Sequence, residues 1–393
     1  MNTPGLATRA VRGGIDCDAA HGAVTPPLHL SSTFSFAGLG QPRRYDYGRS
    51  GNPTRDLLAQ TLAGLEGGAG AVVTASGLAA VTTVLALLGP DDLLVAPHDG
   101  YGGCWRLFTA LARRGQLRLA LVDQRDPGAL AAALARRPRL LWLETPSNPL
   151  LRLVDIAALA RAGHAAGALV CVDNTFLSPA LQRPLALGAD LVVHSTTKYL
   201  NGHSDVVGGA VVAARPGLVD ELAWWANALG LTGSPFDSLL TLRGVRTLTL
   251  RMAQHQANAA AVAQRLVGAP GIAAVHWPGL PGHPDHALAL RQQDGPGAIV
   301  SVELAGGEAA VRAFLAGLAC FTLAESLGGV ESLVAHPATM THAAMSEQAR
   351  AQAGIGPGLL RLSVGIEDAA DLLADIDRAL ARIAAVPARA VAA

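Results

Sequence analysis

The sequence predicts an α/β protein, with a large domain on a mostly parallel sheet and a smaller C-terminal unit. The central part of the 393-residue chain alternates short apolar runs with longer amphipathic ones, which is typical of parallel strands connected by helices. The short runs are almost continuously hydrophobic, and this favours strands that are buried on both faces. Hydrophobic residues make up 50% of the chain, so it can bury a sizeable core.

The N-terminal part is predicted to be an extended arm, because about the first fifty residues are rich in Gly, Pro and Ser and lack a clear period. A helix is predicted to follow the arm, with Thr54 as its N-cap. It runs through Leu65 and is expected to stop at Gly67–Gly68, since glycine commonly follows the last turn of a helix.

The alternating part of the chain predicts a sheet of seven strands, at Ala71–Ala75, Leu93–Ala96, Leu117–Val122, Leu140–Leu143, Ala168–Val172, Asp190–His194 and Gly209–Ala213. Helices are predicted between them at Leu78–Leu88, Trp105–Arg113, Pro127–Arg136 and Asp155–Ala166. One long helical stretch without an internal proline, Asp237–Val267, is expected to bridge to the second unit. The second unit has predicted strands and a terminal helix at Ala298–Leu304, Phe321–Ala324, Leu359–Val364 and Ala369–Ile383.

Composition excludes several classes of function. The formal net charge is zero and the pI is about 7.2, so neither nucleic acid nor an anionic membrane is an expected partner. We find no run of 18 apolar residues, so no membrane span is expected. The four cysteines lack the spacing of a metal site, so no metal is predicted. The same scattered cysteines predict a reduced, cytoplasmic setting. They are Cys17, Cys104, Cys171 and Cys320.

Lys198 is the only lysine among 30 lysine and arginine residues. A lysine amine can form a Schiff base with a carbonyl compound or transfer a proton, whereas a guanidinium stays protonated. A compositional bias toward arginine explains the missing lysines equally well. The residues around Lys198 are therefore needed to distinguish a functional lysine from one left by chance.

Polar segments follow several predicted strands, where open α/β sheets place their ligands. At Ser76–Leu78 a strand turns into a helix, and Gly77 permits close approach to the free N–H groups and positive dipole end that bind phosphate. At Glu144–Pro149 two prolines fix a loop that leaves Asn148 projecting. Each segment alone is also compatible with an ordinary structural turn.

Two further segments add a carboxylate and an amine. Asp173 ends an apolar strand and needs a partner, which is a protonated pyridine nitrogen or, alternatively, a helix N-terminus or an arginine. Ser195 and Thr197 supply hydroxyls beside Lys198. A phosphate cradle, a carboxylate for a ring nitrogen, an amide for a ring hydroxyl and an amine for an aldehyde are together what pyridoxal 5′-phosphate requires.

At this point the sequence resembles the Cys/Met-metabolism family of pyridoxal-phosphate enzymes. The resemblance spans nearly the whole chain and is carried by the motifs Tyr47–Thr54, Asp173–Phe176, Ser195–Asp205 and Glu325–Gly329. It implies a fold-type I PLP-transferase with a seven-stranded, mostly parallel sheet and a smaller α+β C-terminal domain. It divides the chain into an N-terminal arm that contacts a neighbouring subunit (1–58), a PLP-binding domain (59–250) and a C-terminal domain (251–393).

The resemblance also implies roles for the residues that bind the cofactor. Lys198 would bind the aldehyde and transfer protons, Asp173 would keep the ring nitrogen protonated, and Tyr101 would stack on the ring and act as a base. Asn148 would contact the ring hydroxyl. The remaining cofactor contacts would come from Gly77, Leu78, Thr175, Ser195 and Thr197 and, from a neighbouring subunit, Tyr47 and Arg49. A homo-oligomer is therefore expected, as a tetramer of two dimers that share their sites.

Substrate contacts follow from the same resemblance. Arg361 would bind the α-carboxylate with Ser326 nearby, and its place inside an apolar strand favours an anionic partner. Glu325 and Asp46 match positions that contact the distal amino group of cystathionine or cysteine. Ser50 stands where succinyl-using members carry a second arginine, which leaves Arg106 and Arg49 as cationic candidates for the distal carboxylate.

The implied activity is γ-replacement, in which O-succinylhomoserine or O-acetylhomoserine reacts with cysteine to give cystathionine in transsulfuration and methionine biosynthesis. The alternative is cleavage of cystathionine to cysteine, 2-oxobutanoate and ammonia. A methionine-cleaving enzyme would need a reactive cysteine near Tyr101, and Cys104 is close but not at the expected position. A nicotinamide dehydrogenase would need G-x-G-x-x-G, and Gly68–Val73 lacks the last glycine. A catalytically silent binding protein would have lost Lys198.

Overall fold

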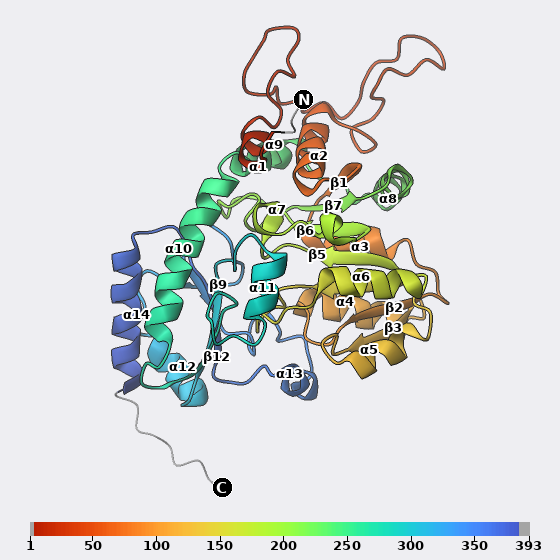
Figure 1. Ribbon diagram of the computed structural model, residues 1–393. Coiled ribbons are helices and arrows are strands. Elements are labelled where there is room, and N and C mark those ends of the chain that lie inside the picture. Colours follow the sequence, from red (N-terminus) through yellow and green to blue (C-terminus); the bar gives the residue numbers. More distant parts are fainter. Residues whose placement is uncertain (1–3, 385–393) are drawn as a thin grey trace.

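The chain folds around two sheets, as the sequence predicts for an α/β protein. The computed structural model describes residues 4–384, and Figure 1 shows the two sheets side by side with helices around them. The larger, 7-stranded sheet has the order β1-β7-β6-β5-β4-β2-β3, and the 5-stranded sheet has the order β10-β11-β12-β9-β8. Within the described residues, no helix combines the length and the apolarity needed to cross a membrane.

All seven predicted strands of the large sheet are confirmed, with ends shifted by about one residue at most. They are β1 (Gly70–Thr74), β2 (Leu93–Pro97), β3 (Arg118–Val122), β4 (Leu140–Glu144), β5 (Leu169–Asp173), β6 (Leu191–Ser195) and β7 (Gly209–Ala213). Strands β2 to β6 pair in parallel, whereas β7 runs antiparallel to both β6 and β1. The loop from β6 to β7 contains no helix, so it reverses the chain instead of crossing back over the sheet.

The helices that were predicted between these strands are also present. They are α3 (Gly77–Leu85), α4 (Gly102–Arg113), α5 (Pro127–Leu134) and α6 (Ile156–Ala165). The structure adds α8 (Pro216–Leu229), the short α1 (Leu6–Val11) and α7 (Ser178–Leu181), and the 3₁₀ helix η1 (Pro184–Leu187), which the sequence pattern did not predict. Because helices bury the strands of the large sheet, the edge formed by the carboxyl ends of β4, β5 and β6 is left open to a ligand.

The first long helix, α2 (Pro53–Glu66), begins differently from the prediction. Its N-cap is Asn52, whose side chain accepts hydrogen bonds from the N–H groups of Thr54 and Arg55, so the assignment of the cap to Thr54 was wrong. Thr54 instead ties down the arm, since its hydroxyl donates to the carbonyl of Pro27. The predicted stop is confirmed, because Gly67 ends α2 in the left-handed conformation with φ of 79°.

The predicted long helical stretch over Asp237–Val267 is two helices, α9 (Pro235–Val245) and α10 (Leu248–Leu266). Arg246 and Thr247 separate the two helices. A side chain at Gly244 would collide with the carbonyl of Asn201, so the end of α9 presses on the loop that carries Lys198. The guanidinium of Arg251 then donates to the carbonyls of Gly244 and Tyr199, both at 2.8 Å, and holds this junction together.

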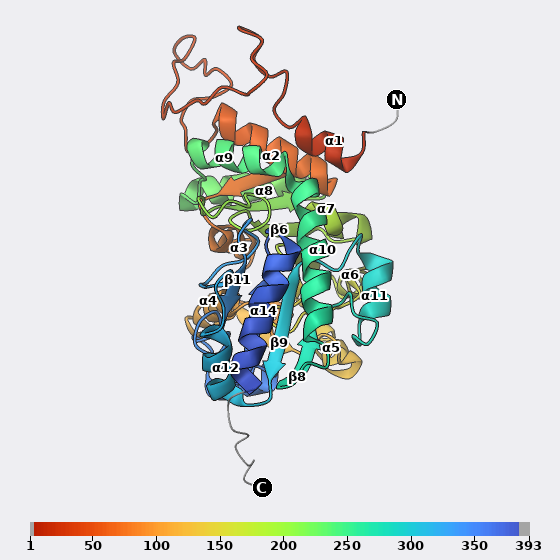
Figure 2. The same ribbon diagram turned by 90° about the vertical axis from the view of Figure 1, so that its left-hand side faces the viewer.

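The second unit contains the predicted strands β9 (Ile299–Leu304), β10 (Thr322–Leu323) and β12 (Leu359–Ser363) and the terminal helix α14 (Ala369–Ala384). Strands β8 (Ile272–His276) and β11 (Leu333–Ala335) were not predicted, and neither were α11 (His286–Gln292), α12 (Gly307–Leu315) and α13 (Glu347–Ala353). Figure 2 shows α10, α12 and α14 covering one face of this sheet.

The arm leaves the body of the molecule as two extended loops beyond α1 and α2 (Figures 1 and 2). It exposes several apolar side chains, among them Leu30 at 67% and Leu39 at 105% of their reference area. The predicted boundaries after residues 58 and 250 fall inside α2 and α10. The division of the chain at those residues therefore stays a prediction.

Candidate active site

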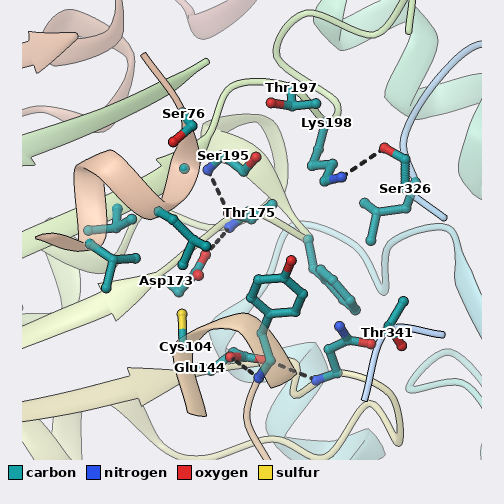
Figure 3. Close-up of a pocket in the computed structure, with 18 of the residues that line it drawn as sticks. Ser76, Cys104, Glu144, Asp173, Thr175, Ser195, Thr197, Lys198, Ser326 and Thr341 are labelled. Carbon is teal, nitrogen blue, oxygen red and sulfur yellow. Dashed lines mark hydrogen bonds between the residues drawn. The ribbon is translucent and has the colours of Figure 1, made fainter. Parts of the chain in front are cut away.

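A cavity of about 410 Å³ opens at the carboxyl ends of β4, β5 and β6 and is closed on its far side by residues of the second unit (Figure 3). This volume suits a ligand of small-molecule size. Most of the site residues predicted from the sequence line it: Gly77, Leu78, Tyr101, Asn148, Asp173, Thr175, Ser195, Thr197, Lys198, Glu325, Ser326 and Arg361. The fold therefore brings together segments that are far apart in the chain.

One end of the cavity is formed by the N-terminus of α3. The side chain of Ser76 caps this helix by accepting the N–H of Ala79 at 3.0 Å. Among the described residues, the N–H groups of Gly77 and Leu78 have no hydrogen-bond partner. A Cβ at Gly77 would lie 2.8 Å from the Cβ of Ser195, so only glycine permits this approach. Free N–H groups and a positive helix end suit a phosphate.

Hydroxyl groups surround the same end. The hydroxyl of Thr175 accepts the N–H of Ser195 at 2.9 Å, and the hydroxyl of Thr197 accepts the N–H of Gly208 at 3.0 Å. These bonds fix the backbone of the loop that follows β6. Figure 3 shows Ser76, Ser195 and Thr197 gathered at this end of the cavity. The donor set contains no carboxylate and therefore fits an anionic group.

Asp173 forms part of the cavity wall beyond Thr175. Its Oδ1 accepts the N–H of Thr175 at 3.0 Å, and within residues 4–384 its carboxylate takes part in no ion pair. Burial raises the pKa of Asp173, while the hydrogen bonds from Thr175 and the charge of His194 lower it. Among the described residues, neither a helix N-terminus nor an arginine is its partner, so the two structural alternatives considered from the sequence are not seen there. A carboxylate in this state favours a cationic group in the cavity.

Lys198 reaches the cavity from the loop after β6 (Figure 3). Its Nζ donates to Oγ of Ser326 at 2.7 Å. Burial and, to a smaller extent, the charge of Arg361 lower the pKa of Lys198 to about 8, whereas the charge of Glu325 opposes the shift. An appreciable share of the amine is therefore neutral near neutral pH and available as a nucleophile or a base.

The lowered pKa of Lys198 predicts its reactivity in the protein without added cofactor. Acylation by an amine-reactive reagent should rise with pH with a midpoint near 8, against about 10.4 for an exposed lysine. Peptide mapping by mass spectrometry separates Lys198 from the terminal amine, because Lys198 is the only lysine. A midpoint as high as that of free lysine would contradict the desolvated environment.

Arg361 lies in the middle of β12 and is 2% exposed. Its Nη1 donates to Oδ1 of Asn148 at 3.0 Å, and its Nη2 donates to the carbonyl of Ser326 at 2.7 Å. Its Nε is buried and, among the described residues, has no partner. Burial lowers the pKa of Arg361 to about 10. Since a buried guanidinium without a paired carboxylate is costly, the site favours an anionic ligand.

The structure gives Asn148 a contact that the sequence did not suggest. Its side-chain oxygen is directed at Arg361, whereas the resemblance assigned the side chain to a ring hydroxyl. Tyr101, at the start of α4, is 39% exposed. Burial raises the pKa of Tyr101, as do Cys104 and Glu325, while Arg106 and Arg361 lower it.

Several cavity residues escaped the sequence analysis as site residues, among them Glu144, Cys104 and Thr341. Glu144 ends β4 and is 7% exposed; its position directly opposite Asp173 in the sheet was the available signal. Cys104 is buried, and burial raises the pKa of its thiol well above the usual value, which disfavours a reactive thiolate. Thr341 comes from the loop after β11, where no local pattern marks it.

Four predicted residues do not line the cavity of their own chain: Asp46, Tyr47, Arg49 and Arg106. The first three lie on the arm, where the guanidinium of Arg49 donates to the carbonyl and the side-chain oxygen of Asn227 at 2.7 and 2.9 Å. Arg106 is exposed on α4. Any contact of the arm residues with a cavity therefore requires the cavity of another copy.

Comparison with known proteins gives consistent matches. The family model described as Cys/Met metabolism PLP-dependent enzyme matches residues 7–381. Cystathionine gamma-synthase of Escherichia coli is 59% identical over 374 residues, which are 94% of this chain and 96% of that protein. The crystal structure of cystathionine gamma synthase from Xanthomonas oryzae pv. oryzae in complex with cystathionine is 63% identical, with a TM-score of 0.97, and the match covers 98% of this chain and 100% of the other. Cystathionine gamma-lyase from Lactobacillus plantarum, complexed with L-serine, is 42% identical, with a TM-score of 0.94 over 97% of this chain and 100% of the other.

Proposed function

Because the chain belongs to the Cys/Met metabolism PLP-dependent enzyme family, we propose that it catalyses a γ-replacement that forms cystathionine. The substrates are O-succinylhomoserine or O-acetylhomoserine and cysteine. The observation that carries the proposal is the arrangement of Lys198, Asp173 and Arg361 around one cavity in a chain 59% identical to a cystathionine gamma-synthase. A cytoplasmic location is part of the proposal, since all four cysteines are free thiols.

The residues present fit pyridoxal 5′-phosphate. The free N–H groups of Gly77 and Leu78 would bind its phosphate, the unpaired carboxylate of Asp173 its ring nitrogen, and Lys198 its aldehyde carbon. When bound, the cofactor supplies a ring that accepts the electron pair released when an amino acid loses its α-proton. By remaining ionised, Asp173 keeps a proton on the ring nitrogen and so strengthens this acceptor.

Arg361 would bind the α-carboxylate of the substrate through its guanidinium. Asn148 and the carbonyl of Ser326 already fix two of its nitrogens, so the planar group is oriented before the substrate arrives. A bidentate contact with a carboxylate gives both affinity and direction. The α-hydrogen would then be held close to the amine of Lys198, which shares Ser326 with Arg361.

Lys198 would move the protons of the reaction. With its Nζ free, Lys198 would accept the proton that leaves Cα and, once it has released this proton, the proton that leaves Cβ, so that the γ-acyloxy group departs as a carboxylate. The thiol of cysteine adds at Cγ, and protons return to Cβ and Cα to give cystathionine. A pKa of about 8 for Lys198 lies near the working pH, which favours both acceptance and return of a proton.

A substitution at Arg361 tests the binding of the α-carboxylate. Arg361→Lys keeps a cation but loses the planar pair of donors, and we expect the KM of the homoserine ester to rise about 10- to 100-fold with a smaller change in kcat. Steady-state kinetics at saturating cysteine measures this. The matched control is Arg113→Lys, the same exchange at the exposed last residue of α4, which should leave KM unchanged.

We also propose that the active form is a homo-oligomer, a tetramer of two dimers. The support is the arm, because Tyr47 and Arg49 are exposed and do not line the cavity of their own chain. A second copy would bring them to the phosphate end of its partner's cavity. Mixing an Arg49→Ala variant with a Lys198→Ala variant should restore activity if sites are shared, since hybrid dimers then contain one intact site.

Cleavage of cystathionine is the second candidate, favoured by Ser50 and by the likeness to the Lactobacillus plantarum lyase. The hydroxyl of Ser50 donates to Oδ1 of Asp46 at 2.6 Å, and a serine there supplies no cation for a succinyl carboxylate. Both esters with cysteine, and cystathionine alone, should be assayed side by side on the purified protein with cofactor. Mass spectrometry would report cystathionine or 2-oxobutanoate as the main product. Failure of both esters to give cystathionine would overturn the proposal.

A further inference from the structure

Glu144 is a buried carboxylate in the cavity wall to which the proposed reaction gives no part. It is the last residue of β4, is 7% exposed, and pairs in register with Asp173 on β5. Burial raises the pKa of Glu144 and so does the charge of Asp173, whereas the N–H groups of Tyr101 and Asn148 lower it. Keeping an ionisable side chain here is costly unless its oxygens are used.

Each oxygen of Glu144 accepts one backbone N–H from a different loop. Oε2 accepts the N–H of Tyr101 at 2.8 Å, and Oε1 accepts the N–H of Asn148 at 2.9 Å. Tyr101 follows β2 and Asn148 follows β4. Figure 3 draws both bonds converging on Glu144 beneath the cavity. The carboxylate is therefore a joint between the two loops.

The loop before Tyr101 lies tightly on this joint. A Cβ at Gly100 would lie 3.1 Å from Oε2 of Glu144. A Cβ at Gly103 would collide with the ring of Tyr101, and one at Gly102 would collide with the carbonyl of Thr341. The ring of Tyr101 thus packs on the first turn of α4. The hydrogen bond from the N–H of Tyr101 to Glu144 determines where that turn begins.

Asn148 is held at three polar atoms. Its N–H donates to Glu144, its carbonyl lies 2.9 Å from Nε2 of His342, and its Oδ1 accepts from Arg361 at 3.0 Å. Burial lowers the pKa of His342 to about 4, so the ring is neutral and Nε2 donates. Because Asn148 is bonded to both residues, the position of Glu144 affects the position of the Arg361 guanidinium.

We propose that Glu144 is a positioning residue that sets Tyr101 and, through Asn148, Arg361 in their working places. One side chain thereby aligns the aromatic cover of the cofactor with the group that binds the substrate carboxylate. The inference deepens the proposed function and depends on it for the roles of Tyr101 and Arg361. The joint itself is a property of the chain without any ligand.

The first test measures the joint directly. Glu144→Gln keeps the shape but leaves one acceptor oxygen for two N–H groups. In the full chain without added cofactor, we expect the amide hydrogen of Tyr101 or of Asn148 to exchange at least about tenfold faster than in the unsubstituted chain. Hydrogen exchange with fragmentation mass spectrometry resolves the two positions.

The matched control is Asp190→Asn. Asp190 is also a buried carboxylate at a strand of the same sheet, and it accepts the N–H of Val170 at 2.9 Å and contacts His164. It precedes β6 and so lies at the edge opposite the cavity. This variant should lose stability without changing the exchange of Tyr101 and Asn148.

The second test separates positioning from general stability in the loaded enzyme. Glu144→Gln should lower kcat/KM for the homoserine ester about 100-fold, with KM and kcat both affected, because a small displacement of aligned groups is costly. The visible circular dichroism of the bound cofactor should change with it. Asp190→Asn should change neither reading by more than about twofold.

Two results would overturn the inference: unchanged exchange at both amides, or unchanged kinetics and circular dichroism, in Glu144→Gln. A variant that does not fold is replaced by Glu144→Asp, which keeps both acceptor oxygens on a shorter side chain and should speed exchange at one of the two amides; unchanged exchange there would also overturn the inference. An unsubstituted chain that neither takes up cofactor nor makes cystathionine would instead overturn the proposed function, while the exchange test would still stand.

Discussion

Replacement of Lys198 by alanine abolishes turnover, with kcat expected to fall by at least about 10⁴-fold. No other lysine is present to take its place, and a guanidinium neither condenses with an aldehyde nor gives up its proton. Lys198→Arg should therefore be as inactive as Lys198→Ala, although it preserves the charge. The readouts are cystathionine formation and the site of the adduct after borohydride reduction, mapped by mass spectrometry.

Ser326→Ala is the matched control for this prediction. It removes the hydroxyl that accepts from Nζ of Lys198 at 2.7 Å but leaves the amine in the cavity. A loss of about tenfold is expected, since one hydrogen bond is at stake. Measurable γ-replacement by Lys198→Ala, or a reduced adduct on any other residue, would contradict the role of Lys198.

Asp173→Asn is expected to lower kcat by about 10³-fold or more, because asparagine cannot hold a proton on the ring nitrogen by its charge. The same substitution should raise the melting temperature of the chain without cofactor. The pKa of Asp173 is raised in the folded state, mainly by burial, so the ionised carboxylate lowers the free energy of unfolding at any pH above that pKa. This cost disappears as the pH falls through the raised pKa, and asparagine removes it at every pH.

Thermal unfolding measured across pH, together with kcat, checks both parts. The gain in stability of Asp173→Asn should be largest at neutral pH and should vanish in acid, where Asp173 is protonated. Thr175→Ala is the control, since it removes the hydroxyl that hydrogen-bonds to Asp173 and leaves the carboxylate ionisable. A variant that is both less stable and still active would show that Asp173 is only a structural residue.

The large sheet was predictable because its strands are apolar on both faces, so each run could be delimited to about one residue. The direction of β7 was not, since no residue of Gly209–Ala213 records the turn that precedes it. The close approach of Gly244, near the end of α9, to Asn201 was not predictable either, because the two residues are distant in sequence. The start of α2 was predictable in principle, because Pro53 marks the first turn and leaves Asn52 as the cap.

The site was predictable where chemistry singles out a residue type. Lys198 is unique, and Asp173 and Arg361 are charges inside apolar strands. Glu144 was overlooked because a glutamate before a proline-rich loop looks like part of a turn until β4 and β5 are placed in register. Thr341 reaches the cavity wall, and His342 reaches the carbonyl of Asn148, only through the packing of the second unit on the first.

The inward direction of the sole ε-amine has a practical consequence for handling the protein. Its outer surface offers only guanidinium groups as permanent side-chain cations. Coupling chemistry that normally decorates a protein at many places, as in immobilisation on activated beads or dye conjugation, will attack this one at its reaction centre or at a chain terminus. Preparations intended for such supports should be coupled through carboxylates or thiols instead, or shielded by bound cofactor during the coupling.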